Sequence, residues 1–141
     1  MFMVQEMKKH LMNLYFLALS DGEFAPQELD TILEIAQEKG FSQQEFQQML
    51  INPPVGIFQT PSEFMDKIFL LYDFAKVILA DGVIDDNEVA TFLKFCERFG
   101  FEAEVSRELF DWLIHLARKK LNSEQLKQEI TNLISNQNGT I

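Results

Sequence analysis

The sequence predicts an all-α protein, and three observations lead to that fold class. Apolar residues recur every three or four positions over long stretches, which is the period of one face of a helix. Only 6 of the 141 residues are glycine and 4 are proline, so residues that interrupt helices are scarce. The sequence also repeats itself at an offset of 60 residues. Together these features predict a single helical bundle of six or seven helices.

The repeat aligns residues 14–50 with 74–110 without a gap. Eight pairs are identical in this register: Leu19/Leu79, Asp21/Asp81, Gly22/Gly82, Glu28/Glu88, Thr31/Thr91, Leu33/Leu93, Gly40/Gly100 and Phe41/Phe101. Composition alone would give roughly two or three identities. The apolar positions repeat too, so we expect two similar three-helix halves related by a pseudo-twofold axis. A half of this size buries too little area to fold alone, so the two halves are expected to form one domain.

The elements of each half follow from the same patterns. In half one, about 3–51, we expect helices over 3–20, over 26–39 and from Ser42 onward. Half two, about 61–120, is expected to hold the counterparts, which begin near Pro61, cover 86–99 and begin near Glu102. The segment Thr60-Pro61-Ser62-Glu63 indicates a capping box with proline at the first helical position. Residues 52–60 read as a linker that contains two prolines, residues 123–135 as a last helix, and the tail after it as frayed.

The charge balance limits the classes of partner. Lys and Arg total 12 and Asp and Glu total 22, which gives a formal net charge of −10. Such a chain repels phosphate, so nucleic acid and anionic membrane surfaces are not expected as partners. A divalent cation or a protein with a basic surface fits the sign better.

The sequence also bears on the compartment. No apolar run reaches about 18 residues, so direct membrane insertion is not expected. Lys8, Lys9 and His10 precede the apolar stretch 11–19, which resembles a short signal peptide. The same segment recurs inside the chain at 74–80, which argues against that interpretation. A single cysteine, Cys96, excludes an intrachain disulfide and suits a reducing compartment, so we expect a cytoplasmic protein.

An acidic turn occurs twice, as DGEFAPQE at 21–28 and DGVIDDNE at 81–88. Its Asp and Glu have the spacing of the second half of an EF-hand loop, where carboxylates bind Ca²⁺. The first half of such a loop is missing, because its ligand positions would fall on apolar residues: Leu17, Leu19, Val77 and Leu79. An ordinary EF-hand site is therefore not expected.

A purely structural interpretation of the turn is also open. Gly22 and Gly82 would end the preceding helix, and Asp85 would cap the next helix with Glu88 as its partner. This interpretation explains Asp21 and Asp81 less well, because each follows a helix end where negative charge is unfavourable. Two copies of an unfavourable residue suggest a use. The metal-ligand candidates are Asp21, Glu28, Asp81 and Glu88, with Asp85 as a weaker fifth.

The repeated A/S-D-G-x-[I/F]-x-x-x-E turns between helices of an acidic chain resemble the bacterial tellurite-resistance TerB family. The N-terminal regions of some membrane-anchored J-domain co-chaperones share this pattern. The resemblance covers about 14–117 and implies a TerB-like helical fold and a role in bacterial stress response. It also implies that the four carboxylates Asp21, Glu28, Asp81 and Glu88 bind metal. No J-domain, no anchor and nothing specific to tellurite chemistry is seen in these 141 residues.

Three function classes follow from these features. The first is a non-enzymatic acidic binding module of a stress-response type that holds a divalent cation such as Ca²⁺ or Mg²⁺ in its two turns. The alternative is a protein-interaction adaptor whose turns are purely structural. The third, a hydrolase that pairs Glu28 with Glu88, would need a pocket and an acid with a raised pKa. We expect no enzyme, no catalytic residue and no cofactor besides the cation.

The remaining reactive side chains are expected to be structural. The pairs Glu6/His10 and Asp111/His115 have helical i,i+4 spacing, which predicts a local hydrogen bond or ion pair in each. Cys96 aligns with Ala36 between phenylalanines and is expected to be a small core residue.

Overall fold

The computed structural model describes residues 4–19, 26–51 and 61–139. These residues form seven α-helices and one short 3₁₀ helix, with no strand among them, so the all-α prediction is confirmed. The elements in chain order are α1 (Val4–Leu19), α2 (Pro26–Glu38), α3 (Gln43–Ile51), α4 (Phe64–Ile78), η1 (Leu79–Asp81), α5 (Asp86–Arg98), α6 (Ala103–Arg118) and α7 (Ser123–Gly139).

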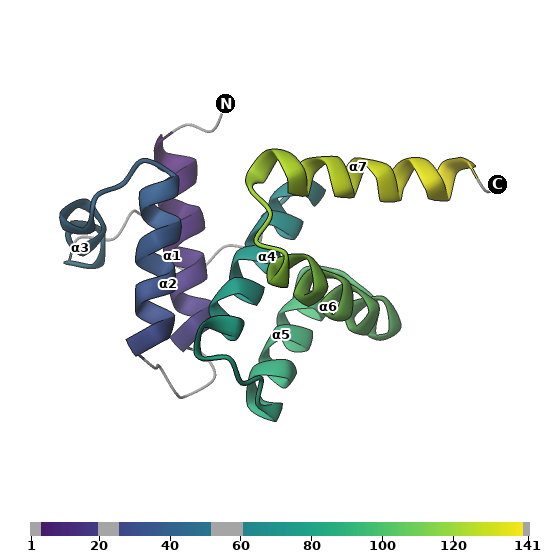
Figure 1. Ribbon diagram of the computed structural model, residues 1–141, viewed down its shortest axis with the longest axis horizontal. Coiled ribbons are helices and arrows are strands. Elements are labelled where there is room, and N and C mark those ends of the chain that lie inside the picture. Colours follow the sequence, from purple (N-terminus) through teal and green to yellow (C-terminus); the bar gives the residue numbers. More distant parts are fainter. Residues whose placement is uncertain (1–3, 20–25, 52–60, 140–141) are drawn as a thin grey trace.

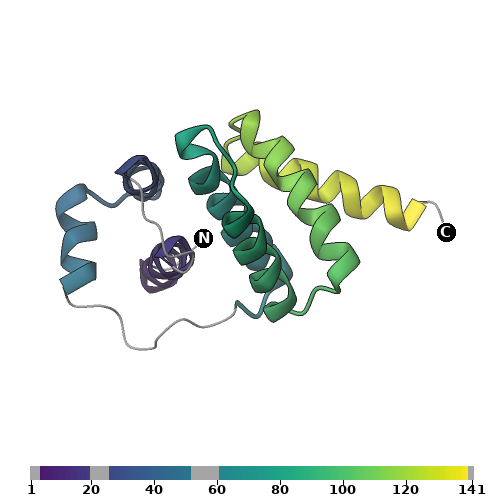
Figure 2. The same ribbon diagram turned by 90° about the horizontal axis from the view of Figure 1, so that it is seen from below.

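Helix α4 is the centre of the fold. It contacts α1 and α2 on one side and α5 and α6 on the other, so that it lies between the two groups of helices (Figures 1 and 2). Nine of its 15 residues are buried, including Leu70, Leu71 and Phe74. A helix that is apolar on nearly every side is stable only when it is surrounded, which explains its place.

One continuous core joins both groups of helices through aromatic contacts. Phe74 of α4 stacks on Phe92 of α5, with ring centroids 5.9 Å apart. Phe92 in turn meets the edge of Phe110 in α6, at 5.0 Å. Such pairs are stabilising beyond the area they bury, by roughly 1 kcal/mol each.

Helices α2 and α5 repeat each other closely. Each has 13 residues, and their buried residues stand at positions 60 apart: Glu28/Glu88, Ile32/Phe92, Ile35/Phe95 and Ala36/Cys96. Each helix is also followed, two residues after its end, by a glycine of positive φ: Gly40 at 92° and Gly100 at 99°. Glycine adopts this conformation without steric cost. The register of the sequence repeat is therefore visible in these two helices. The pseudo-twofold axis and the division into halves remain predictions.

Two helix ends differ from the expectation. Helix α4 begins at Phe64 with Glu63 as its N-cap, and Glu63 makes no side-chain capping bond, so a helix start at Pro61 is wrong. Thr60, the other half of the expected capping box, lies outside the described residues, as does the expected linker 52–60. Helix α7 runs to Gly139, beyond the expected end at 135, because nothing in the sequence NQNG stops a helix before its glycine.

No helix within the described ranges is both long enough and apolar enough to span a bilayer.

Candidate functional site

The second acidic turn is a helix start held by its own carboxylates. Gly82 follows η1 as its C-cap, with a φ of 81°. The N–H of Gly82 donates to the carbonyl of Leu79, and this bond closes the 3₁₀ turn. Asp85 is the N-cap of α5: its Oδ1 accepts from the N–H of Glu88 at 2.8 Å. Glu88 Oε1 accepts in return from the N–H of Asp85 at 3.1 Å. The expected capping box is confirmed, and it engages two of the five predicted ligands.

The repeated glutamates are buried. Glu28 is 5% exposed and Glu88 is 3% exposed, and each is the third residue of its helix. A carboxylate in the first helical turn is favoured by the positive end of the helix dipole. Helix α2 also contacts η1, and the two meet at the lower end of the molecule in Figure 1. The start of α2, with Glu28, and the 3₁₀ helix η1 thus lie at the same end of the fold.

The predicted metal ligands are placed only in part. Asp21 lies outside the described residues, and Asp81 is the last residue of η1. Among residues 4–19, 26–51 and 61–139, no three His, Cys, Asp or Glu side chains form a group that could hold a metal ion. Since that search leaves out residues 20–25, the cation site remains a prediction. The hydrolase hypothesis also stays untested: both glutamates are buried, and Glu88 is engaged at the helix start.

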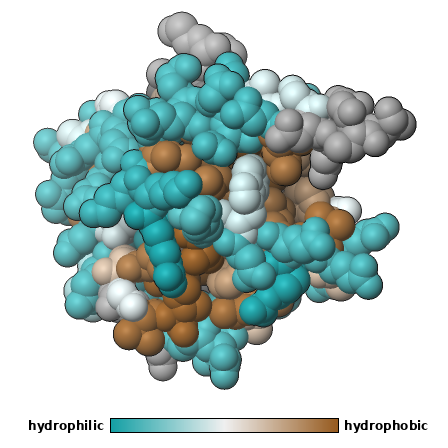
Figure 3. All heavy atoms as spheres, turned by 45° about the vertical axis from the view of Figure 1, so that its right-hand side comes forward, coloured by the Kyte–Doolittle hydropathy of each residue, from teal (hydrophilic) through white to brown (hydrophobic). Residues whose placement is uncertain are grey.

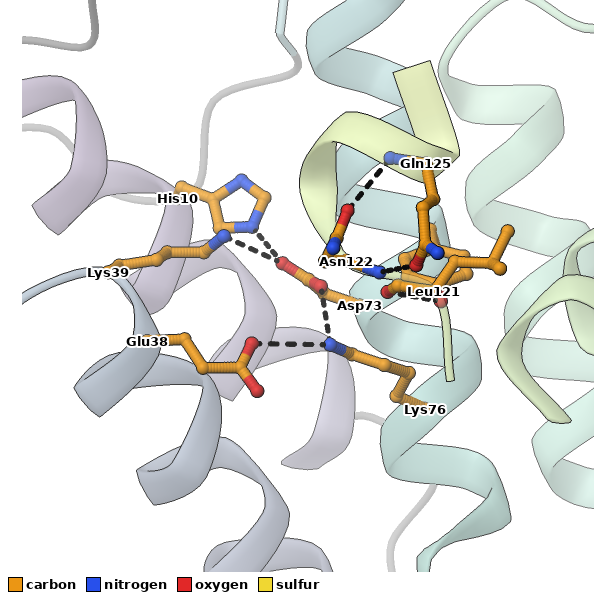
Figure 4. A network of polar contacts seen from close by, with 9 residues as sticks. His10, Glu38, Lys39, Asp73, Lys76, Leu121, Asn122 and Gln125 are labelled. Carbon is orange, nitrogen blue, oxygen red and sulfur yellow. Dashed lines mark hydrogen bonds and ion pairs between the residues drawn. The ribbon is translucent and has the colours of Figure 1, made fainter. Parts of the chain in front are cut away.

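A charged cluster around the buried Asp73 joins α1, α4 and the end of α2, and sequence reasoning missed it (Figure 4). His10 Nε2 lies 2.6 Å from Asp73 Oδ2, and Lys39 Nζ lies 3.4 Å from the same oxygen. Lys76 Nζ is 3.7 Å from Asp73 Oδ1 and 3.7 Å from Glu38 Oε2. We call these five residues the Asp73 cluster. It ties residues 63 positions apart in sequence.

The cluster sets the ionisation of its central carboxylate. Burial by itself raises the pKa of Asp73. The hydrogen bond from His10 and the positive charges of His10, Lys39 and Lys76 outweigh burial and lower that pKa to about 2. Asp73 is therefore an anion at every physiological pH, and its role is to hold His10 and the ammonium groups of Lys39 and Lys76 together.

One sequence signal could have revealed this cluster. Asp73 stands between Tyr72 and Phe74 inside the most apolar helix, where an unpaired charge would be strongly unfavourable. Its partners come from other helices, so the i,i+4 rule does not find them. The side chain of Glu6, the expected local partner of His10, lies outside the described residues, and Asp111 meets Arg107, at 3.8 Å, as an i,i+4 partner. Cys96 is fully buried as expected, and burial raises the pKa of its thiol to about 12.

Helix α7 is anchored at its start. The Tyr72 hydroxyl donates to the carbonyl of Leu121 at 3.0 Å, and burial raises the pKa of Tyr72 to about 12. Asn122 and Gln125 then form reciprocal side-chain to backbone bonds around the first turn, which Figure 4 also shows. Leu126 and Ile130 are buried. Leu133, one turn further, is 40% exposed, so the second half of α7 extends past the core.

An apolar stripe on α6 is left partly uncovered. Val105, Leu109 and Trp112 lie on one side of α6 at i, i+4 and i+7 spacing. Val105 is 44% exposed, and Leu109 and Trp112 are half-buried against the core. Phe64 at the start of α4 is 47% exposed and meets the edge of Phe101 at 6.3 Å, beside the start of α6.

These residues form what we call the α6 groove: Phe64, Phe101, Val105, Leu109 and Trp112. Helix α7 follows α6 in the chain and leaves the bundle from the end of α6 (Figures 1 and 2). The space-filling view that brings the right-hand side of Figure 1 forward shows apolar atoms exposed between polar side chains (Figure 3). Exposed apolar surface of this kind typically marks an interaction site.

The rim of the α6 groove is acidic. Glu63 and Glu102 are the exposed N-caps of α4 and α6, the two helices whose starts meet at Phe64 and Phe101. Glu104 and Glu108 are exposed on α6 next to the apolar stripe. The nearest cations are engaged: Lys67 Nζ donates to the Phe99 carbonyl at 2.8 Å, and Arg107 lies beside Asp111 and over the ring of Phe110.

Comparison with known proteins adds no family: no family model, no curated protein and no solved structure matches the chain. The resemblance to the TerB family therefore remains a prediction from the repeated turns.

Proposed function

We propose that this chain is a non-enzymatic adaptor that binds a protein with a basic surface through the α6 groove. The observation that supports the proposal is the pairing of an uncovered apolar stripe with an acidic rim. Apolar contact supplies most of the affinity of such an interface, and complementary charge supplies speed and selectivity. The net charge of −10 acts in the same direction, because it attracts basic surfaces at long range.

The adaptor is favoured over the cation module by what the second turn does. Asp85 and Glu88 satisfy each other's backbone groups, and Glu88 is buried in doing so. These contacts give the repeated Glu a use that needs no ion. The cation module keeps Asp21 and Asp81 as its distinctive residues, and a bacterial stress-response role belongs to the same set of hypotheses.

A thermal melt of metal-stripped protein separates the two. The adaptor predicts no saturable rise of the midpoint with Ca²⁺, Mg²⁺, Mn²⁺ or Zn²⁺. A filled site at 100 times its dissociation constant would add about 2.7 kcal/mol and raise the midpoint by several degrees. A saturable rise that disappears in the Asp21→Asn/Asp81→Asn variant would replace the adaptor with the cation module.

The adaptor itself is tested by photocrosslinking in the organism that encodes the chain. A photoreactive amino acid is placed at Val105 in the groove or, as a matched control, at Val83, which is 66% exposed beside η1 at the other end of α4. The proposal predicts a discrete protein adduct from position 105 and none from position 83. Equal labelling at both positions, or none at either, would contradict it.

A further inference from the structure

We infer that the partner enters the α6 groove as a basic amphipathic α-helix. This inference rests on the proposed adaptor function and names the class of ligand that the groove fits. Three features support it: the spacing of the apolar stripe, the position of the acidic rim, and the charge of this chain.

The stripe has the dimensions of a helix-binding surface. Val105 and Trp112 are seven positions apart, or about 10 Å along α6, which equals about two turns of a partner helix. Over that length an amphipathic helix presents apolar residues at i, i+3 or i+4, and i+7. Helix-in-groove recognition uses this same set of anchors. An extended strand would need an open sheet edge for its backbone, and the described residues contain no strand.

The acidic rim indicates that the ligand carries positive charge. Glu104 and Glu108 flank the stripe on its outer side, and Glu63 and Glu102 stand at its beginning. On the same outer side of α6, His115 follows about two turns after Glu108, and Lys119, the C-cap residue, about three turns after it. Lys or Arg residues beside the apolar face of a partner would meet the first four groups, so the basic end of the partner helix is expected over the first half of α6.

A second copy of this chain fits the groove less well. Helix α7 carries the exposed Leu133 in its second half, and residues 130–141 contain no charged side chain to meet the rim. Two copies would also bring together net charges of −10 each. A basic helix would be attracted by the acidic rim, whereas a second copy of the chain would be repelled by it.

The single tryptophan of the chain, Trp112, provides a direct measurement. The probe is an 18-residue peptide of Leu and Lys with helical amphipathic spacing and blocked ends, which contains no aromatic residue. We expect the emission of Trp112 to shift to the blue in a saturable way, with a dissociation constant below about 10 µM at low salt. A peptide of the same composition in scrambled order should bind at least about tenfold more weakly, because it has the charge without the apolar face.

Two pairs of variants locate the binding. Val105→Lys, at an exposed helical position, should weaken binding by tenfold or more, whereas Val83→Lys should leave it unchanged. Glu104→Gln/Glu108→Gln should weaken it about fivefold and reduce its salt dependence, whereas Asp30→Asn/Glu34→Gln on the exposed face of α2 should do neither.

Several results would overturn the inference. They are equal binding of the scrambled peptide, equal loss in both members of a variant pair, and tighter binding of a Leu/Glu peptide of the same spacing. Sedimentation without peptide gives a further one: a dimer that Val105→Lys abolishes would assign the groove to a second copy. Adducts at position 105 together with failure of the peptide would reject only the helical basic ligand, whereas absence of adducts would reject the adaptor.

Discussion

Helices α1 and α4 bury a polar residue at equivalent places, but with different charge. Asn13 and Asp73 stand 60 positions apart, in the register of the repeat, and both are buried. Asn13 is neutral. Asp73 is an anion surrounded by His10, Lys39 and Lys76. Because two of these partners, His10 and Lys39, come from outside α4, the charged version of the position joins α4 to α1 and to the end of α2.

The starts of α2 and α5 differ in a similar way. Helix α5 has Asp85 as its cap, whereas the repeat places Ala25 at the corresponding position and α2 begins with Pro26. Both versions keep the buried Glu. In both pairs of positions the repeated residue stays buried while its polar contacts change, so the polar contacts distinguish the two regions.

The largest loss of stability is expected from Asp73→Asn, which places in α4 the asparagine that α1 has at position 13. The change leaves His10 and the ammonium groups of Lys39 and Lys76 without their central anion, which should lower the free energy of unfolding by about 3 kcal/mol. Urea denaturation followed by circular dichroism measures this. Asp30→Asn, an exposed neutralisation on α2, should change it by less than about 0.5 kcal/mol. A loss of less than about 1 kcal/mol in Asp73→Asn would show that the cluster is not important for stability.

Acid unfolding tests the same difference between a charged and a neutral residue at position 73. The pKa of Asp73 is about 2 in the folded protein, below its ordinary value near 4, so its carboxylate stabilises the fold fully above pH 4. That contribution, roughly 2 kcal/mol, is lost as the pH falls from about 4 through 2. Denaturation midpoints measured from pH 6 to pH 2 should fall less steeply in Asp73→Asn than in the wild type. Parallel curves would mean that other carboxylates determine acid stability.

A smaller effect is expected from Asp85→Ala, which gives α5 the residue found at position 25. It removes the bond to the N–H of Glu88 and should lower the free energy of unfolding by about 1 kcal/mol. Ser42→Ala is the matched control, because Ser42 Oγ accepts from the N–H of Glu45 in the same manner at α3. Similar losses in the two variants would assign Asp85 a capping role only. A loss above about 3 kcal/mol for Asp85→Ala would indicate a further role for its carboxylate.

The smallest effect is expected at Cys96, where the repeat has Ala36. Both side chains are buried at equivalent places, so Cys96→Ala should cost about 1 kcal/mol or less through the loss of one sulfur atom. The raised pKa of the thiol also predicts slow alkylation by iodoacetamide at pH 8 in the folded protein and rapid alkylation in urea. Fast alkylation of folded protein would contradict this burial.

The sequence predicted features that depend on neighbouring residues. The seven helices, the glycine turns after α2 and α5, the Asp85–Glu88 capping box and buried Cys96 all follow from local spacing and are confirmed. The start of α4 was misplaced because Pro61 is compatible with a first helical turn but does not require one. The Asp73 cluster and the α6 groove were missed because each combines residues that lie far apart in the sequence. Their pairing depends on tertiary packing, which periodicity does not describe.

The bond between His10 and Asp73 has a consequence for synthesis. Chains emerge from the ribosome at about 5–20 residues per second, so a gap of 63 residues takes roughly 3–13 seconds to complete. During that interval α1 and α2 exist without α4, the helix on which both pack. Their apolar faces are then exposed to other nascent chains and to chaperones. The order of translation thus makes α4 the step that ends the vulnerable period of this protein.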